Sequence, residues 1–189
     1  YPLRRQRQMC IRDRLKAILE TPMLDPLQEL GRRAFLFSTF TGLAYVDIML
    51  LHPHHIGTTA DGRRYIRINR KKTNVEAFIP LHPIAEQILS LYTKEKSRGD
   101  YKIFPDTMSD WKLLSHLKAV GLACGIRTPL TWHCARHTFA TLAIEYGMPI
   151  DIIAKILGHT NTNMTRRYAK ISEANISREM KKIGEMLSL

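Results

Sequence analysis

The sequence contains few cysteines and no long apolar run. Its three cysteines, Cys10, Cys124 and Cys134, show no paired spacing. An odd number without a framework argues against a disulfide-stabilised secreted scaffold, so we expect a reducing, cytoplasmic setting. No apolar stretch approaches the roughly 20 residues that a membrane-spanning helix needs. We therefore expect no membrane partner.

Acidic residues are also scarce. Seventeen aspartates and glutamates stand against 29 lysines and arginines, which gives a formal net charge of +12. Such a balance indicates a polyanionic partner, with nucleic acid foremost, although basic surfaces can also be merely solvated. At 189 residues the chain suits one domain with a sizeable core.

The first 14 residues differ from the rest of the chain. They lack apolar periodicity and hold five arginines against one aspartate. We interpret residues 1–14 as a non-native or disordered basic segment and exclude them from the fold. A basic arm that binds DNA is the alternative. The segment contributes +4 of the net charge, so residues 15–189, the expected domain, keep about +8.

Apolar periodicity predicts a mainly helical chain with one small sheet. Helices are expected over residues 14–20, 25–39, 83–95, 111–124, 132–146, 149–157 and 172–187, with a short helix after Gly42. Residues 65–69 and 75–81 alternate as strands around a turn, and a further short strand is expected before residue 61. The fold class is therefore α+β, mainly α with a small antiparallel β-sheet.

One stretch of the C-terminal half concentrates groups suited to phosphate chemistry. His133 and Arg136 lie three positions apart, so a helix would place them on one face. Thr131 can cap that helix, which would put both groups in its first turn. His159 follows the next helix, and Tyr168 comes nine positions later. This pattern favours a tyrosine nucleophile directed at a phosphodiester that the basic groups hold.

These residues stand in the order that marks the catalytic domain of tyrosine recombinases. The chain has HCAR at 133–136, LGH at 157–159 and Tyr168 nine residues later, where that family has H-x-x-R, L-G-H and its nucleophile. The chain thus resembles the phage integrase family over roughly residues 15–185, and within it the mobile-element integrases of the Bacteroidetes type. The resemblance implies the tyrosine recombinase catalytic-core fold for residues 15–189. It also implies an upstream core-binding domain that is absent here, so we expect a piece of a longer protein.

The resemblance also assigns roles in the hairpin and in the short helix after Gly42. By its distance from Pro80, Lys72 matches the catalytic lysine of the family. The first of the family's two catalytic arginines falls on Ala44, whereas the acid three positions on is kept as Asp47, for which we expect a supporting role. Losing a guanidinium from a phosphoryl-transfer site can reduce the rate by several orders of magnitude.

Arg70 is the expected substitute for that missing arginine. Period-two geometry puts it on the same side as Lys72 if the strand persists that far. Its guanidinium could then act where Ala44 cannot, and Arg67 is the alternative donor. Both arginines could instead contact only the DNA backbone.

The sequence predicts no metal and no cofactor. HPHH at 52–55 lies in an irregular, proline-containing loop and lacks the distant partner ligands that zinc spacing requires. HCARH at 133–137 imitates the helix of a zinc protease, but Cys134 stands where that chemistry needs a glutamate.

The resemblance implies a site-specific DNA recombinase or integrase that cleaves and rejoins DNA through a 3′-phosphotyrosyl intermediate. Tyr168 would be the nucleophile, His133 its proton acceptor and Lys72 the general acid. Arg136 and His159 would stabilise the pentacoordinate phosphorus. The partner would be double-stranded DNA, bound by a homo-oligomer, in this family a tetramer. The protein would lie in the bacterial cytoplasm, associated with the nucleoid.

Two alternatives stay open. One is a DNA-binding module of the same fold that has lost cleavage, which the missing arginine at Ala44 favours. The other is a relaxing topoisomerase of type IB, which uses similar chemistry without strand exchange.

Overall fold

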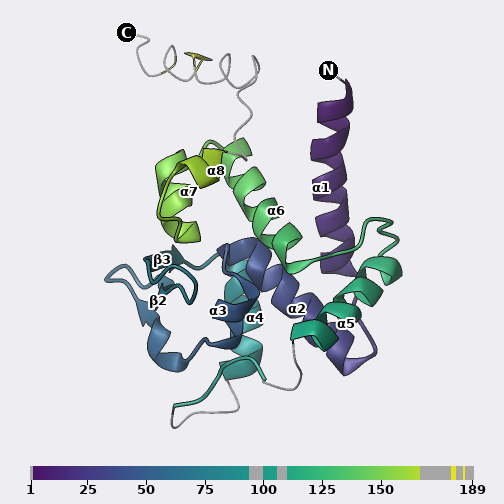
Figure 1. Ribbon diagram of the computed structural model, residues 1–189, viewed down its shortest axis with the longest axis horizontal. Coiled ribbons are helices and arrows are strands. Elements are labelled where there is room, and N and C mark those ends of the chain that lie inside the picture. The colour runs from purple at the N-terminus through teal and green to yellow at the C-terminus, as the bar shows by residue number, and fades with distance from the viewer. Residues whose placement is uncertain (1, 94–99, 106–109, 167–179, 182–184, 186–189) are drawn as a thin grey trace.

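The structure is a computed structural model that describes residues 2–93, 100–105, 110–166, 180–181 and 185. A small sheet lies at one side of the molecule, next to the helices (Figure 1). The elements are α1 (Pro2–Glu20), α2 (Pro26–Thr41), α3 (Tyr45–Met49), the 3-10 helix η1 (Pro53–His55), β1 (Ile56–Thr58), β2 (Arg64–Asn69), β3 (Glu76–Pro80), α4 (Pro83–Thr93), α5 (Asp110–Ala123), α6 (Trp132–Glu145), α7 (Ile150–Leu157) and α8 (Asn163–Arg166). The expected fold class, mainly α with a small antiparallel sheet, is confirmed.

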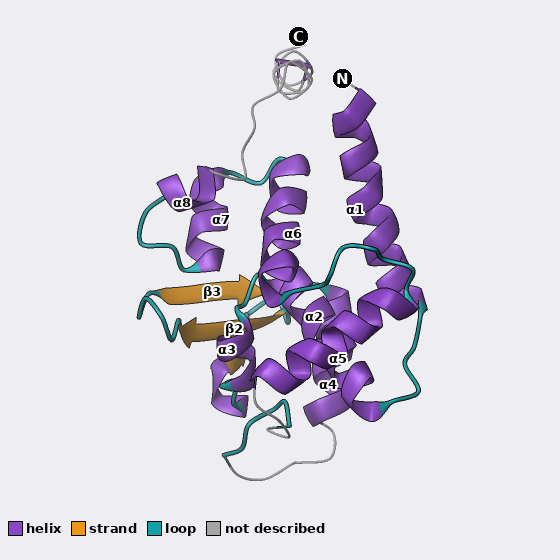
Figure 2. Cartoon of the chain, turned by 45° about the vertical axis from the view of Figure 1, so that its right-hand side comes forward, coloured by secondary structure: helices purple, strands orange, loops and turns teal. Residues whose placement is uncertain are grey.

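The central helix is α2, and its own sequence sets its ends. Asp25 accepts hydrogen bonds from the backbone N–H groups of Leu27 and Gln28, at 2.8 and 2.9 Å. Gly42 ends the helix in the left-handed conformation, with φ of 68°, which glycine adopts without a steric cost. In between, α2 packs against α4, α5 and α6, and Figure 2 shows it in the middle of the molecule.

The sheet is antiparallel, in the order β1–β2–β3. Ile66 of β2 pairs with Ile56 on one side and with Ile79 on the other. The pleat buries Ile66 and Ile68 and leaves Arg67 exposed, as expected of a strand with one face on the core. α7 packs against β3 (Figure 2), so this helix lies directly against the sheet.

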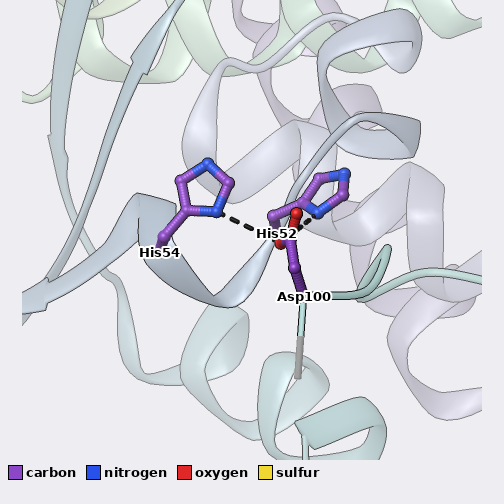
Figure 3. Close-up of side chains that lie close together, drawn as sticks. All are labelled: His52, His54 and Asp100. Atoms are coloured by element: carbon purple, nitrogen blue, oxygen red, sulfur yellow. Dashed lines mark hydrogen bonds and ion pairs between the residues drawn. The ribbon is translucent and has the colours of Figure 1, made fainter.

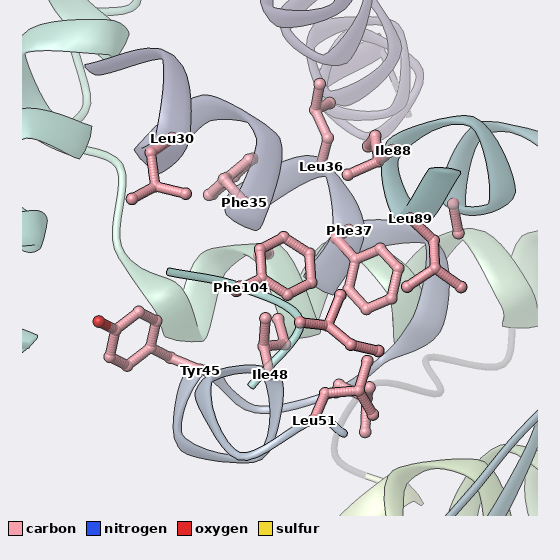
Figure 4. Packing of buried hydrophobic residues seen from close by; sticks show 14 of the residues in the cluster. Leu30, Phe35, Leu36, Phe37, Tyr45, Ile48, Leu51, Ile88, Leu89 and Phe104 are labelled. Atoms are coloured by element: carbon pink, nitrogen blue, oxygen red, sulfur yellow. The ribbon is translucent and has the colours of Figure 1, made fainter. Parts of the chain in front are cut away.

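The hydrophobic core is built around α2. Phe37 and Phe104 are fully buried, and their ring centroids lie 5.1 Å apart. Ile48 and Leu51, from α3 and the residues after it, complete this part of the core (Figure 4). The core therefore holds α3 and the residues around Phe104 against α2.

Two element ends differ from the expectation. α1 begins at Pro2 rather than near residue 14, and Arg12 within it forms an ion pair with Glu145 of α6. Most of the expected helix over 172–187 lies outside the described residues; residues 180–181 and 185, which are described, are helical. Nowhere in the described part of the chain is there a helix long and apolar enough to cross a membrane.

Glu29 joins α1 to α2 through a small network of hydrogen bonds. Its carboxylate accepts from Arg32 at 2.8 Å, from Arg33 at 2.7 Å and from the backbone N–H of Met23 at 3.1 Å. Arg32 also donates to the carbonyl oxygen of Ile18 at 2.8 Å, which satisfies a free carbonyl group at the end of α1.

This network predicts an acid-sensitive contribution to stability. Burial raises the pKa of Glu29, but the hydrogen bonds from Arg32, Met23 and Arg33 outweigh it and lower the pKa from 4.5 to about 2. Glu29 therefore stabilises the fold above about pH 4.5, and this stabilisation is lost as the pH falls towards 2. We expect Glu29→Gln to lower the free energy of unfolding by about 2 kcal/mol at pH 7 and far less at pH 2.5, measured by urea unfolding. Glu20→Gln, at an exposed position, is the control. An equal loss at both pH values would contradict the prediction.

Candidate active site

Two arginines from distant parts of the chain meet at the carbonyl oxygen of Gly42. Arg136 of α6 donates to it through Nη1 at 2.7 Å, and Arg70, just after β2, donates through Nη2 at 3.4 Å. Gly42 stands at the end of α2, so its carbonyl group faces away from the helix ladder. The structure thus holds two guanidinium groups close together, an arrangement that suits an anion.

Arg70 is buried, with 4% of its surface exposed, and Asp47 holds it in place. Its Nε atom lies 3.1 Å from Oδ2 of Asp47, whose other oxygen accepts from the backbone N–H of Lys71 at 2.8 Å. Burial lowers the pKa of Arg70 and Asp47 opposes that shift; the guanidinium stays charged at physiological pH. Its Nη1 atom is buried without a hydrogen-bond partner among the described residues.

Arg70 reaches this position because β2 ends at Asn69. Beyond it the chain turns: the N–H of Arg70 donates to the carbonyl of Val75 at 3.0 Å, and the N–H of Asn74 donates to the carbonyl of Arg70 at 2.8 Å. The strand therefore does not persist to Lys72, and the expectation that Arg70 and Lys72 share one side of it is wrong. Arg70 is buried beside Asp47 and Gly42, whereas Lys72 is exposed in the turn.

Arg136 joins α6 to the end of α7. Thr131 caps α6 as expected, accepting from the N–H of Cys134 at 3.2 Å. This cap sets the first turns of α6, which carry His133 and Arg136. Nη2 of Arg136 donates to the carbonyl oxygen of Leu157 at 2.5 Å, and Leu157 is the last residue of α7. The guanidinium therefore satisfies a free helix-end carbonyl while facing Arg70.

His159 follows Gly158, which ends α7 with φ of 63°. Its Nδ1 atom lies 2.8 Å from Oγ1 of Thr165. Burial lowers the pKa of His159, and the positive charge of Arg70 lowers it further, so the imidazole is neutral near pH 7. Thr73 of the hairpin turn donates to the carbonyl of Gly158 at 3.0 Å. The hairpin, α7 and His159 therefore form one connected group.

Four of the expected site residues come together here: Asp47, Arg70, Arg136 and His159. They come from α3, the turn after β2, α6 and the loop after α7, elements that are separate in sequence. Tyr168, the expected nucleophile, lies outside the described residues.

His133 is exposed at the start of α6. Trp132, its neighbour, stacks on Tyr45 with ring centroids 4.4 Å apart, which holds the start of α6 against the start of α3. Ala44 occupies the N-cap position of α3 and supplies no side-chain hydrogen bond there. Within the described residues, neither His133 nor the exposed Lys72 hydrogen-bonds to the two guanidinium groups.

Arg67, the alternative donor, packs on aromatic rings of the sheet. Its guanidinium lies over the rings of Tyr65 and Phe78, 5.7 and 5.6 Å from their centroids. It borders a surface hollow of about 460 Å³ that Asp47 and Lys71 also line. Arg70, and not Arg67, is therefore the arginine that pairs with Asp47.

Three further contributors were not expected from the sequence: the carbonyl group of Gly42 and the hydroxyls of Thr73 and Thr165. Carbonyl groups carry no sequence signature, because every residue has one. The two threonines stand beside motif residues, but nothing in their spacing marked them as hydrogen-bond partners.

A comparison with known families decides the relationship. The sequence model that describes the phage integrase family matches residues 11–175. This chain belongs to the phage integrase family. Its similarity to curated members of that family includes the tyrosine recombinase XerD of Staphylococcus epidermidis, which is 26% identical over 175 residues, covering 87% of this chain and 58% of XerD. It also includes the tyrosine recombinase XerA of Thermococcus onnurineus, 34% identical over 92 residues, covering 49% of this chain and 30% of XerA.

Solved structures of a site-specific recombinase and of a transposon integrase share the fold. The XerH site-specific recombinase bound to its difH substrate aligns with a TM-score of 0.69 at 18% identity, covering 90% of this chain and 51% of XerH. The Tn1549 transposon integrase in complex with a circular intermediate DNA aligns with a TM-score of 0.67 at 20% identity, covering 88% and 63%. The chain spans less than two thirds of the length of these relatives. The resemblance to tyrosine recombinases is confirmed, and the closer likeness to integrases of the Bacteroidetes type stays a prediction.

Proposed function

We propose that this chain is the catalytic part of a site-specific DNA recombinase of the phage integrase family. The observation that carries the proposal is the meeting of Arg70 and Arg136 at one carbonyl oxygen, with His159 beside them. Two guanidinium groups and an imidazole are suited to the non-bridging oxygens of a phosphodiester, whose negative charge spreads during in-line displacement.

The proposed reaction begins with Tyr168. Its hydroxyl oxygen attacks a DNA phosphorus, the new P–O bond to tyrosine forms, and the bond to the 5′ oxygen breaks, which gives a 3′-phosphotyrosyl enzyme. A tyrosine has an intrinsic pKa of about 10, so its proton needs an acceptor, and His133 takes that role. Lys72 donates a proton to the leaving 5′ oxygen. Attack by a 5′ hydroxyl on the phosphotyrosine reverses the step and rejoins DNA without metal or cofactor.

Arg136, Arg70 and His159 stabilise the negative charge on the non-bridging phosphate oxygens. The neutral imidazole fits this role: if the hydroxyl of Thr165 donates to Nδ1 of His159, the remaining proton sits on Nε2, a hydrogen-bond donor for a phosphate oxygen. Arg70 supplies the guanidinium that Ala44 cannot, and Asp47 supports the site by holding Arg70. The unpartnered Nη1 atom of Arg70 is the donor proposed to reach the phosphate.

Double-stranded DNA is the proposed partner, bound by several copies of the protein as a tetramer. The net charge of +12 suits a phosphate backbone, and the structures of XerH and the Tn1549 integrase were solved with DNA. The competing function is a DNA-binding module without cleavage, which Ala44 favours. Supercoil relaxation by a monomer would instead indicate a topoisomerase.

Trapping the covalent intermediate tests the proposal. We expect wild-type protein to form an adduct on a denaturing gel with a pool of nicked duplexes of randomised sequence, and Tyr168→Phe to form none, because the phenylalanine ring has no nucleophilic oxygen. Tyr146→Phe, at the exposed residue that follows α6, should match wild type. Binding of DNA by the wild type without an adduct would favour the binding module.

A further inference from the structure

Two histidines and an aspartate meet on the side of the molecule that carries η1. Oδ1 of Asp100 lies 2.7 Å from Nδ1 of His52 and 3.3 Å from Nδ1 of His54. The three side chains converge in Figure 3, and one ligand-type atom from each lies within 4.8 Å of the others. In the sequence, His52 lies 48 positions before Asp100 and His54 lies 46 positions before it. None of these residues belongs to the proposed DNA-processing group.

The backbone on both sides of this cluster is fixed by the core. The N–H of Ile103 donates to the carbonyl of Leu51 at 2.8 Å, which joins the chain just before His52 to the chain just after Asp100. Leu51 and Ile103 are buried, with 0% and 1% of their surfaces exposed. The two segments are therefore held next to each other by contacts that do not depend on the cluster.

The histidines are also oriented locally. The backbone N–H of His52 donates to Nδ1 of His55 at 3.0 Å, so His55 uses that nitrogen as an acceptor. The rings of His54 and His55 lie against each other, with centroids 4.1 Å apart. His55 thus supports the turn, while His52 and His54 keep their Nδ1 atoms on Asp100.

We propose that His52, His54 and Asp100 bind a divalent transition-metal ion of the zinc class. Imidazole nitrogens and a carboxylate oxygen suit Zn²⁺, which takes nitrogen at about 2.0–2.1 Å and carboxylate oxygen at about 2.0–2.2 Å. Ligand atoms this close to one another can surround one ion after small side-chain rotations. With three protein ligands, water completes the coordination.

The metal would join η1 to the segment at Asp100. The sequence argued against a metal here because the HPHH loop lacks the partner ligands that zinc spacing requires. The tertiary structure brings one such ligand, Asp100, to the loop. His54 also lines the hollow that Asp47 and Lys71 border, so the ion would stiffen one wall of it. This proposal does not depend on the proposed recombinase function, and its test uses no DNA.

Calorimetric titration with Zn²⁺ alone tests the site, with Co²⁺ absorption as the spectroscopic readout. We expect one equivalent to bind wild-type protein and to raise its thermal midpoint. Asp100→Asn and His54→Ala should each weaken binding by more than about tenfold, since even partners outside the coordination shell are worth 10–100-fold. His116→Ala is the matched control: His116 also faces a carboxylate, Asp25, at 3.9 Å, without a second histidine there.

The two substitutions also keep the proposal falsifiable. Asp100→Asn keeps the size of the side chain, and both substituted residues are exposed, so the metal-free variants should unfold at the wild-type midpoint. Tight binding that survives in the double variant His54→Ala/Asp100→Asn would place the metal elsewhere and overturn the proposal. Wild-type binding no tighter than that of the double variant would overturn it as well.

Discussion

Replacing Arg70 by alanine is expected to reduce covalent adduct formation by about 10²–10³-fold, the effect of removing one preorganised charge-stabilising donor. Arg70 is the cation beside Arg136 that the described residues offer in place of the missing arginine at Ala44. Adduct formation is to be measured on the nicked duplexes at a temperature at which the variant is folded. Arg67→Ala removes the same charge from an exposed position of β2 and is expected to leave cleavage within a few-fold of wild type.

The same substitution should destabilise the fold. Without Arg70, Asp47 stays buried at 2% exposure with an uncompensated charge, and breaking a buried ion pair on one side costs about 3–5 kcal/mol. Urea unfolding measures this loss. The double variant Asp47→Ala/Arg70→Ala removes both charges, so it should recover part of the stability and none of the cleavage.

These two readouts separate a catalytic role of Arg70 from a structural one. If Arg70 only holds the fold, cleavage will return together with stability in the double variant. If Arg70→Ala cleaved DNA as fast as wild type, Arg70 would not replace the arginine that is missing at Ala44. Arg136 would then be the remaining guanidinium of the group.

The second large effect is expected at Gly158. A Cβ atom on Gly158 would lie 2.3 Å from Cγ and 3.1 Å from Cδ of Arg70, far inside van der Waals contact. Gly158→Ala must therefore push the Arg70 side chain away from Gly42, in addition to the cost of about 1–2 kcal/mol for a left-handed alanine. We expect a total loss of about 2–5 kcal/mol in the free energy of unfolding and at least a tenfold loss of cleavage.

Gly125 provides the matched control for this substitution. Its φ of 69° is close to the 63° of Gly158, but nothing lies within 4 Å of a Cβ built on it. Gly125→Ala should therefore show the conformational cost without the clash, and cleavage should be unchanged. Equal effects of the two substitutions on unfolding and cleavage would mean that the contact with Arg70 is unimportant.

The sequence alone predicted much of the local structure. Thr131 caps α6, α7 ends at Leu157, and the alternation in β2 and β3 predicted the hairpin. The ordered motif containing Arg136 and His159 predicted the family that the comparison then showed. Each of these signals acts over a few residues, through backbone conformation or the repeat of apolar side chains.

The start of α1 was predicted less well. Residues 1–14 have no apolar period of their own, and on that ground they were excluded from the fold. The helix nonetheless begins at Pro2, and Arg12 finds its partner in Glu145, on a helix far away in the sequence. The periodicity of residues 1–14 cannot indicate a partner that is so far away in the sequence.

The site itself was decided by the tertiary structure. The sequence named Arg70 as a candidate but not its burial, its pairing with Asp47 or its contact with Gly158, because these depend on where β2 stops and how α7 packs on β3. The meeting of His52 and Asp100, 48 positions apart, likewise depends on the packing of the core. The spacing of residues along the chain determines helices, strands and caps. Which charged residues from distant parts of the sequence lie next to each other is decided by the burial of apolar surface in one core.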